Sequence, residues 1–337
     1  FDPAGIMNPG KIVDPPKMDD RALLRFKEGY VREPINTALD WSDWGGLHGA
    51  VEMCNNNGAC RKRDAGVMCP SFRATGDEKD LTRGRANSLR LALSGQLGPN
   101  ALTSDDMYDS MALCVGCKGC KRECPTGVDM ARMKTEFLYH YRQRHGLSLL
   151  DKLVAFLPRY AAIASAFGWL LNLRNKIPGL PAIGQLVTGF AANQPLPAWS
   201  DRPFRDDEVG AVTTGPEVVL WADTFNRWFE PENVRAARRV LEAGGFRVHM
   251  ALPADKGRPL CCGRTFLAAG LVDEARMEAR RVLDSLGPYV KRGVPIVGLE
   301  PSCLLGLRDE FTVLQQGEAA EALAADAYLF EEFLMRE

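Results

Sequence analysis

Four closely spaced cysteines constrain this chain more than any other feature. They lie in the stretch C-V-G-C-K-G-C-K-R-E-C-P, at Cys114, Cys117, Cys120 and Cys124. This C-x2-C-x2-C-x3-C-P spacing is typical of bacterial ferredoxins, in which three cysteines hold one [4Fe–4S] cluster and the fourth ligates another. A structural zinc site would instead need two cysteine pairs that are well apart, so this spacing favours iron–sulfur ligation. Structural zinc is the alternative. The stretch therefore predicts a fold organised around iron–sulfur clusters.

A cluster shared between two motifs requires a second set of cysteines, and one lies upstream. Cys54 and Cys60 are followed by Cys69-Pro70, while Asn57 stands where another ligand is expected. Reading across both motifs gives one complete [4Fe–4S] ligand set, formed by Cys69, Cys114, Cys117 and Cys120. The remaining cysteines of the two motifs, Cys54, Cys60 and Cys124, give the second site three thiolates.

The second site therefore stays open between three interpretations. It can hold a [3Fe–4S] cluster, a [4Fe–4S] cluster whose fourth ligand is borrowed or is not a cysteine, or no cluster at all. His48, which precedes Cys54 in a glycine-rich stretch, is a candidate for a borrowed ligand. Arg83, Arg85 and Arg90 lie between the motifs, where positive charge would stabilise an anionic cluster, but a solvated helix face explains them equally well.

The composition excludes several classes of protein. The 337 residues carry 42 basic and 43 acidic side chains, so the chain lacks the basic excess of a nucleic-acid-binding protein. Its longest apolar run, residues 161–173, is shorter than the roughly 20 residues that cross a bilayer. The ten cysteines occur in clusters, which indicates metal ligation in a reducing compartment. We expect a cytoplasmic protein, with peripheral contact at the inner face of the membrane as a further possibility.

The first half of the chain reads as helical. Residues 1–45 read as a tail or linker with one helix near 21–30, and residues 46–146 as a mainly α-helical, ferredoxin-like iron–sulfur domain. Apolar periodicity predicts helices over 85–94, 105–113 and 129–145. Residues 147–215 are expected to form a helical connector, either buried helices packed on the iron–sulfur domain or an interfacial patch for a membrane or a partner subunit.

The second half, residues 216–337, changes to an alternation of strands and helices. Short apolar strands are predicted over 218–222, 246–252 and 295–299, with helices over 231–243 and 271–286. Such alternation favours a small α/β domain with a parallel sheet. The fold class is therefore mixed, with a helical iron–sulfur domain followed by an α/β domain.

A third group of cysteines falls in this α/β domain. Cys261 and Cys262 are adjacent in a loop before a helix, and Cys303 follows the strand at 295–299. Loops at the carboxyl ends of parallel strands converge on one crevice, so the three sulfurs are expected to meet. The alternative is that Cys261 and Cys262 are simply two small buried residues without a site, because free cysteine is among the most buried residue types.

These stretches resemble a known family. Leu260-Cys-Cys-Gly-Arg264 and the later Gly-Leu-Glu-Pro-Ser-Cys303-Leu-Leu resemble the cysteine-rich CCG domain of heterodisulfide reductase, glycolate oxidase and anaerobic glycerol-3-phosphate dehydrogenase subunits. The opening Phe1-Asp-Pro-Ala-Gly-Ile-Met-Asn-Pro-Gly-Lys11 resembles the last segment of an FAD-linked oxidase. The order of these elements is similar to that of fused FAD-linked D-2-hydroxyacid dehydrogenases acting on D-lactate or D-2-hydroxyglutarate.

The resemblance implies that this chain is the electron-transfer part of such an oxidoreductase. FAD and the substrate site would lie upstream of Phe1, so residues 1–45 would be the end of the FAD-linked domain and a linker, and no catalytic residue is expected here. Electrons would pass from the flavin through [4Fe–4S] centres to a quinone or protein acceptor. The alternatives are an iron–sulfur subunit of a glycolate oxidase or heterodisulfide reductase-like complex, and a zinc or thiol docking module. An oligomer is possible.

The chain departs from the fullest CCG pattern at two positions. Asp223 and Glu300 stand near places where the family has cysteines, so three of five thiols remain. Carboxylates are harder ligands than thiolates and disfavour a sulfur-rich cluster. The candidate metal ligands of this domain are thus Cys261, Cys262 and Cys303, with Asp223 and Glu300 as further possibilities. A single metal, a dithiol redox site and a docking role stay open.

Overall fold

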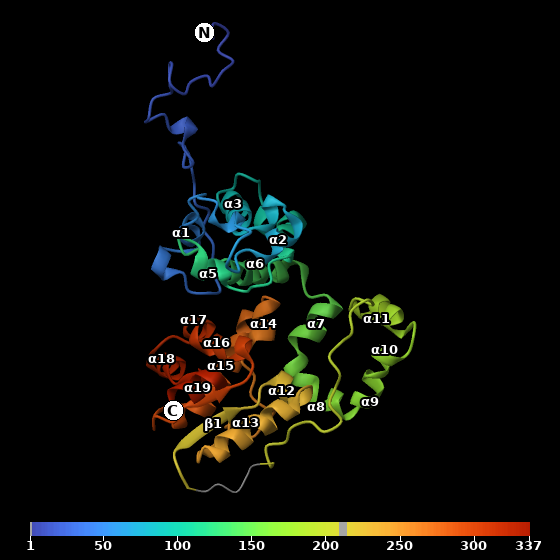
Figure 1. Cartoon of the computed structure of the whole chain (residues 1–337). Helices are drawn as coiled ribbons and strands as arrows, with labels where there is room; N and C mark the ends of the chain where they lie inside the picture. The colour runs from blue at the N-terminus through green and yellow to red at the C-terminus, as the bar shows by residue number, and fades with distance from the viewer. Residues whose placement is uncertain (1, 209–213) are drawn as a thin grey trace.

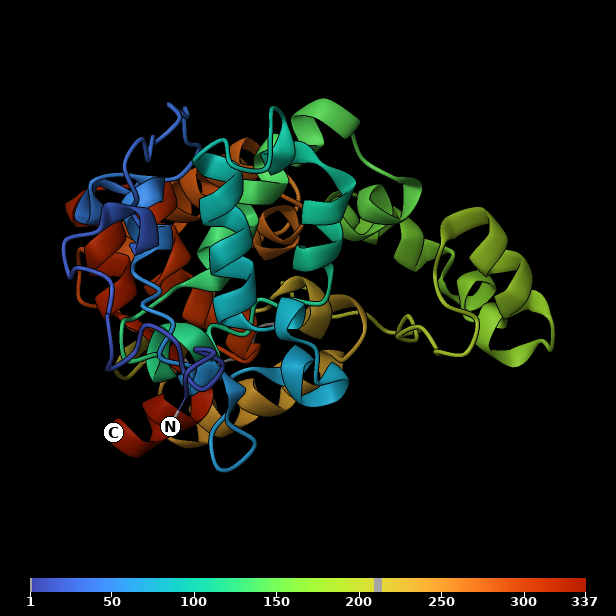
Figure 2. The same ribbon diagram turned by 90° about the horizontal axis from the view of Figure 1, so that it is seen from above.

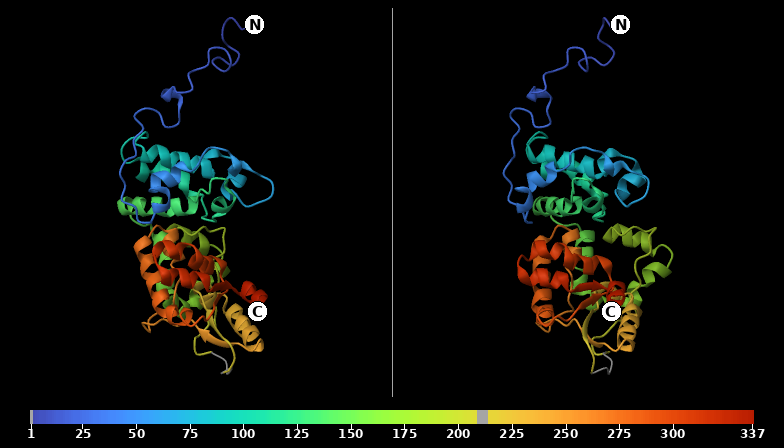
Figure 3. Two further views of the ribbon diagram at one scale, coloured as in Figure 1. Left: turned by 90° about the vertical axis from the view of Figure 1, so that its left-hand side faces the viewer. Right: turned by 60° about the vertical axis from the view of Figure 1, so that its left-hand side comes forward.

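The computed structural model describes residues 2–208 and 214–337, which form a helical part stacked on a sheet-containing part (Figures 1 and 3). The helical part contains α1 (Leu47–Glu52), α2 (Pro70–Thr75), α3 (Thr82–Leu93), α4 (Asp105–Ala112), α5 (Gly119–Glu123) and α6 (Met130–His145). The 3-10 turns are η1 (Arg21–Leu23), η2 (Ser42–Trp44), η3 (Ala59–Arg61), η4 (Glu78–Asp80) and η5 (Ala101–Thr103). The N-terminal tail extends away from this part (Figure 1).

The second part is built on one parallel sheet of four strands, in the order β2-β1-β3-β4. The strands are β1 (Glu217–Trp221), β2 (Arg247–Met250), β3 (Ile296–Gly298) and β4 (Ala327–Leu329). The helices between and after them are α12 (Thr224–Trp228), α13 (Pro231–Ala243), α14 (Arg264–Ala268), α15 (Val272–Val290), α16 (Pro301–Arg308), α17 (Glu310–Leu314), α18 (Glu318–Ala325) and α19 (Phe330–Arg336). The expected mixed fold, rich in helices with a small parallel sheet, is confirmed.

Helices cover both faces of the sheet, which explains why β1 and β3 consist mainly of buried apolar residues. Val218 and Leu220 of β1 face a small core that includes residues of α13 and α19. Val219 and Trp221 face the opposite way, into a core that α15 to α18 complete. That second core continues into the helical part through residues of α6, so the two parts share one apolar interior.

Gly270 lies at a close contact between the two parts. It has a φ of +79°, and a Cβ atom at this position would come within 2.6 Å of the Leu138 side chain of α6. Only glycine combines this left-handed backbone with such a close approach. The turn between α14 and α15 can therefore pack directly against α6.

The connector consists of α7 (Leu149–Ala155), α8 (Leu157–Ala166), α9 (Gly168–Leu171), α10 (Leu173–Lys176) and α11 (Leu180–Thr188). Ala155 and Ala161 are buried, so α7 and α8 pack on the body. Helices α9 to α11 instead project sideways from it (Figure 2). The interpretation of the whole connector as buried helices is wrong for this projection, where Trp169 is 65% exposed and Leu186 is 89% exposed.

Three local predictions also need correction. The helix expected near 21–30 is only the 3-10 turn Arg21–Leu23, which buries no residue and therefore gains no stabilisation from packing. The helix predicted to end near Gly287 continues to Val290, because the Gly287 carbonyl accepts a hydrogen bond from Lys291 N–H. Strand β4 was not predicted from the sequence. The four predicted domain boundaries stay predictions.

Candidate metal centres

Four cysteines from the two ferredoxin-like motifs line one cavity. Its walls include Cys69, Cys114, Cys117 and Cys120, together with backbone from the segments that carry them. Cys69 precedes α2, Cys114 and Cys117 lie between α4 and α5, and Cys120 lies within α5. The structure thus brings together the complete ligand set that the sequence predicts for a [4Fe–4S] cluster, and four thiolates in one cavity fit that group. Its ligation by these residues stays a prediction.

Glycines give the cysteine loop its shape. Gly116 has a φ of +65°, in the left-handed region that favours glycine. A Cβ atom on Gly119 would lie 2.7 Å from the Val67 side chain and 3.6 Å from Cys117 Sγ. The loop can therefore fold tightly around the cavity and pack against the segment that precedes Cys69.

A buried arginine places positive charge at this site. Arg85 of α3 is 1% exposed, and its Nη1 lies 3.8 Å from Cys69 Sγ. Its Nη2 donates to Ser71 Oγ at 3.1 Å, and its Nε donates to the Ser110 carbonyl at 2.8 Å. Positive charge at this position would stabilise an anionic cluster held by the four cysteines. Of the two interpretations of this residue, the structure supports the one beside the cluster ligands.

Cys120 is the thiol of this site whose surroundings resist ionisation. Burial, with smaller contributions from Asp129, Cys114 and Cys117, raises the pKa of the Cys120 thiol to about 12, although a hydrogen bond from the Met130 backbone acts in the opposite direction. A thiol with this pKa is protonated at neutral pH. Binding of iron would displace the proton, so the site is expected to load more readily as the pH rises.

The second predicted site is less well defined. Cys54 and Cys60 are buried, and burial raises the pKa of the Cys60 thiol, with a further contribution from Cys54. Asn57 is exposed, and its Oδ1 accepts a hydrogen bond from Ala59 N–H at 2.8 Å. Cys124 lies just after α5, with its Sγ 3.3 Å from Thr126 Oγ1. The assignment of Cys54, Cys60 and Cys124 to a second cluster stays a prediction.

His48, a candidate for a borrowed cluster ligand, contacts the N-terminal segment in the structure. Its Nε2 atom lies 2.6 Å from the Glu33 carbonyl oxygen. This contact ties the residue to the N-terminal segment.

The third group of cysteines gathers at the carboxyl ends of the strands. Asp223 follows β1 and caps α12 by accepting hydrogen bonds from Phe225 N–H at 2.8 Å and Asn226 N–H at 3.1 Å. Glu300 follows β3 and caps α16, which carries Cys303. Cys261 and Cys262 precede Gly263, the residue before α14. These loops meet as expected for a parallel sheet.

Burial and the contacts among the three thiols raise the pKa of each of them. The hydrogen bond with Cys262, together with burial, raises the pKa of Cys261 well above its usual value. For Cys262 the bond with Cys261 lowers the pKa, but the bond with Cys303 and complete burial outweigh it. For Cys303 the bond with Cys262 lowers the pKa, and burial, Asp223, Cys261 and Glu300 together raise it.

The carboxyl side of this group also resists ionisation. Burial raises the pKa of Asp223, and Glu300 adds to the effect, although the hydrogen bonds from Asn226 and Phe225 oppose it. In the part of the chain that the structure describes, no three His, Cys, Asp or Glu side chains are arranged to hold a single metal ion. The role of Cys261, Cys262, Cys303, Asp223 and Glu300 as metal ligands stays a prediction.

A set of charged contacts between the two parts was not predicted. Arg264, which directly follows Cys-Cys-Gly, donates from Nη2 to the Gly116 carbonyl at 3.1 Å and pairs with Glu310. Lys118 and Lys121 of the cysteine loop pair with Asp309 at 2.6 and 2.9 Å. In the sequence, the signal that could have indicated these contacts is the position of Lys118, Lys121 and Arg264 directly beside the cysteine motifs. They hold the loop of the first site against the part that carries the third group.

Comparison with known proteins agrees with this geometry. Residues 50–128 match the 4Fe-4S dicluster domain. D-2-hydroxyglutarate dehydrogenase of Pseudomonas putida is 28% identical over 360 residues, which cover 92% of this chain and 34% of that protein. The Escherichia coli enzyme of the same name is 26% identical, covering 95% of this chain and 35% of that protein.

A separate iron–sulfur subunit is also related. The glycolate oxidase iron-sulfur subunit of Escherichia coli is 23% identical over 254 residues, covering 73% of this chain and 55% of that protein. No solved structure matches the chain. The chain spans about a third of the length of the dehydrogenases that it matches. It therefore carries a 4Fe-4S dicluster domain and is homologous, over nearly its whole length, to one part of the D-2-hydroxyglutarate dehydrogenases.

Proposed function

We propose that this chain is the electron-transfer part of an FAD-dependent D-2-hydroxyacid dehydrogenase. The observation that carries the proposal is the cavity lined by Cys69, Cys114, Cys117 and Cys120. These four residues would hold a [4Fe–4S] cluster, with Arg85 beside Cys69. When bound, such a cluster supplies one-electron transfer, which lets a flavin that has accepted two electrons deliver them singly. FAD and the hydroxyacid site belong to another part of the enzyme.

The dehydrogenases and the glycolate oxidase subunit support this role through their names and their similarity to the chain. D-2-Hydroxyglutarate is the proposed substrate of the whole enzyme, because its dehydrogenases match over nearly the full chain. An iron–sulfur subunit that serves a separate flavin subunit is the second candidate, favoured by the 73% of this chain that the glycolate oxidase subunit covers. In both candidates a flavin protein donates the electrons, and a quinone or a protein accepts them.

Metal analysis of anaerobically prepared chain tests the proposal. We expect brown protein that dithionite bleaches, with roughly four to eight irons per chain and matching acid-labile sulfide. Cys69→Ser and Cys117→Ser should each remove about four of these irons, because one cluster loses a ligand. Colourless protein that contains zinc, or no metal at all, would overturn the proposal in favour of a docking module.

We also propose that the enzyme works in the cytoplasm and touches the inner face of the membrane through the projecting helices. We call residues 163–188, which carry the end of α8 and all of α9 to α11, the apolar arm. Its exposed large apolar residues are Ile163, Phe167, Trp169, Leu170, Leu171, Ile177, Ile183, Leu186 and Val187. None of the described helices is both long and apolar enough to span a bilayer. Such a surface suits shallow insertion, with aromatic residues at the interface.

The charge around the arm favours an anionic lipid surface over a protein. Residues 152–200 contain no aspartate or glutamate, whereas Lys152, Arg159, Arg174 and Lys176 fall within this range. Basic residues beside an apolar surface add electrostatic attraction to anionic lipid. A membrane-bound quinone would then be within reach of the enzyme.

Vesicle flotation tests the arm directly. The chain should float with vesicles of phosphatidylcholine and phosphatidylglycerol, and less with phosphatidylcholine alone. Leu186→Glu should abolish flotation, while Met277→Glu, at a 52% exposed position on α15, should not. Equal flotation of both variants contradicts the proposal. Failure to float, together with a concentration-dependent dimer that Leu186→Glu breaks, would assign the arm to a second copy of the chain.

A further inference from the structure

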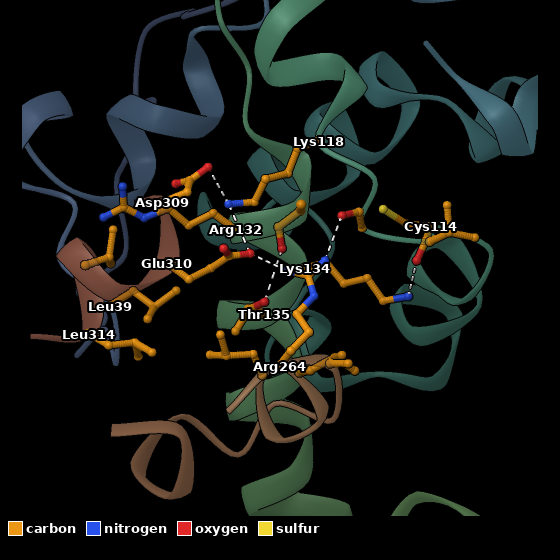
Figure 4. Close-up of a pocket in the computed structure, with 17 residues that line it drawn as sticks. Leu39, Cys114, Lys118, Arg132, Lys134, Thr135, Arg264, Asp309, Glu310 and Leu314 are labelled. Atoms are coloured by element: carbon orange, nitrogen blue, oxygen red, sulfur yellow. Dashed lines mark hydrogen bonds and ion pairs between the residues drawn. The ribbon is translucent and has the colours of Figure 1, made fainter. Parts of the chain in front are cut away.

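Two basic side chains hold the backbone of the cysteine loop between α4 and α5 (Figure 4). From α6, Lys134 Nζ donates to the Cys114 carbonyl at 2.6 Å and to the Ala112 carbonyl at 3.2 Å. From α14, Arg264 Nη2 donates to the Gly116 carbonyl at 3.1 Å. One of these contacts comes from the helical part and the other from the sheet-containing part, so both parts fix the conformation of the loop.

The two contacts also determine where the next N–H groups point. The peptide bonds that follow Cys114 and Gly116 are trans. In a trans peptide unit the carbonyl and the N–H group of the following residue point to opposite sides. Because both carbonyls turn toward the basic side chains, the N–H groups of Val115 and Cys117 turn away from them.

The side of the loop that faces away from the basic side chains borders the cavity of the four cysteines. Val115, Gly116 and Cys117 line this cavity, whereas Lys134 and Arg264 do not. The loop therefore separates the two basic side chains from the cavity. Among the described residues, no backbone carbonyl accepts a hydrogen bond from the N–H group of Val115 or of Cys117. Both groups are thus available to a ligand in the cavity.

We infer that Lys134 and Arg264 are positioning residues for the first cluster. By holding two carbonyls on the outer side of the loop, they direct the N–H groups of Val115 and Cys117 toward the sulfur atoms of the cluster. This inference rests on the proposed function, which assigns a [4Fe–4S] cluster to the cavity. Hydrogen bonds to cluster sulfur atoms stabilise the negative charge that reduction adds, so these donors raise the reduction potential.

Arg264 carries this effect from the sheet-containing part. Glu310 of α17 pairs with its guanidinium. Gly263, directly before it, has a φ of +79°, and a Cβ atom there would lie 3.3 Å from the Ala275 backbone of α15. The start of α14 is therefore packed closely, which fixes the origin of the Arg264 side chain. The potential of a cluster held by the helical part thus depends on a residue of the other part.

A redox titration of iron-loaded full chain, followed by electron paramagnetic resonance, tests the inference. We expect Lys134→Met and Arg264→Met each to lower the ratio of reduced to oxidised cluster at a given potential by about tenfold, a shift of about 59 mV for one electron. Lys118→Met is the matched control, because Lys118 lines the cavity itself and pairs with Asp309 and Glu310. If lost charge alone mattered, this control would shift the potential at least as far. We expect its shift to be clearly smaller.

Electron–nuclear double resonance of the reduced cluster gives the second measurement. In chain whose cluster is assembled in D2O or in H2O, exchangeable proton couplings identify N–H groups beside the sulfur atoms. Arg264→Met should weaken at least one strong coupling that Lys118→Met retains. Equal potential shifts in all three variants, or couplings unchanged in both Lys134→Met and Arg264→Met, would overturn the inference alone. Iron is measured first, since an unmodified chain without iron would overturn the proposed function and this inference with it.

Discussion

The two best-defined groups of cysteines differ in what surrounds their sulfur atoms. Around Cys69, Cys114, Cys117 and Cys120 the protein leaves a cavity and places the Arg85 guanidinium beside one thiol. At the carboxyl ends of the strands, Cys261, Cys262 and Cys303 are 5%, 7% and 6% exposed and hydrogen-bond to one another. The first group lines a space that a cluster could occupy, whereas the three thiols at the strand ends lie where burial and neighbouring groups raise the pKa of each.

Two buried carboxyl groups, Glu136 and Asp223, have pKa values that are shifted in opposite directions. Burial would raise the pKa of Glu136, but hydrogen bonds from His140, Trp41 and the backbone of Ala38 and Leu39 hold it below its usual value. Asp223, near the packed thiols, has a raised pKa because its burial outweighs its hydrogen bonds. The helical part therefore supplies donors to its buried anion, and the third group of cysteines lies where negative charge is disfavoured.

The largest expected effect separates the two groups by their iron. Cys69→Ser should remove about four irons per chain, since serine is a poor ligand for this cluster. Cys262→Ser, a substitution of the same chemistry at a buried thiol, should leave the iron content unchanged. Iron and sulfide analysis of anaerobic preparations measures both. Loss of iron from Cys262→Ser would mean that the packed thiols also bind metal and would break the comparison.

The four cysteines of the first group line one cavity as the sequence indicates, because that information is local, and their ligation of a cluster stays a prediction. Cysteine spacing fixes which thiols can reach one cluster, and glycines at positions such as 116 and 119 shape the loop between them. The strands β1, β2 and β3 and helix α13 were likewise predictable, since apolar runs and a proline at the first helical position mark them. The meeting of Cys261 and Cys262 with Cys303 followed from the topology of a parallel sheet.

The features that were missed depend on contacts between distant segments. Arg264 and Asp309 lie far from the cysteine loop in sequence, and only the packing of α14 and α17 on α6 brings them to it. Strand β4 has three residues, too few for a periodic pattern. The apolar arm has the composition of buried helices, and composition alone does not distinguish a core helix from one that serves an external surface.

The second prediction tests how much the helical part depends on its buried anion. The Glu136 carboxylate accepts hydrogen bonds from Ala38 N–H at 2.7 Å, Leu39 N–H at 2.8 Å and Trp41 Nε1 at 3.0 Å. Glu136→Gln replaces one carboxylate oxygen, which accepts hydrogen bonds, with an amide NH2 group, which donates them and would face an N–H group. The free energy of unfolding should fall by about 2–3 kcal/mol at neutral pH, as measured by urea denaturation.

The pH dependence gives the sign of the same effect. Because the folded pKa of Glu136 is below its usual value of 4.5, its stabilising contribution is present above that value and is lost as the pH falls through the folded pKa. The difference between the unmodified chain and Glu136→Gln should therefore shrink as the pH falls below about 4.5. A difference that is constant from neutral to acidic pH would show that the charge of Glu136 is unimportant.

The smallest expected effect concerns the potential of the first cluster. The Nη1 atom of Arg85 lies 3.8 Å from Sγ of Cys69, a predicted cluster ligand. Reduction of a cluster held there would add negative charge, so a buried positive charge would favour the reduced form. Arg85→Gln should lower the reduction potential by an amount on the order of tens of millivolts, measured by a redox titration followed by electron paramagnetic resonance.

Arg83→Gln is the matched control, because Arg83 pairs with Glu78 and the substitution should leave this potential unchanged. Arg85→Lys keeps the charge and should fall between the two, which separates the electrostatic effect from the loss of the hydrogen bonds to Ser71 and Ser110. If fully loaded Arg85→Gln had the potential of the unmodified chain, the cavity alone, and not the charge beside it, would account for the difference between the two groups of cysteines.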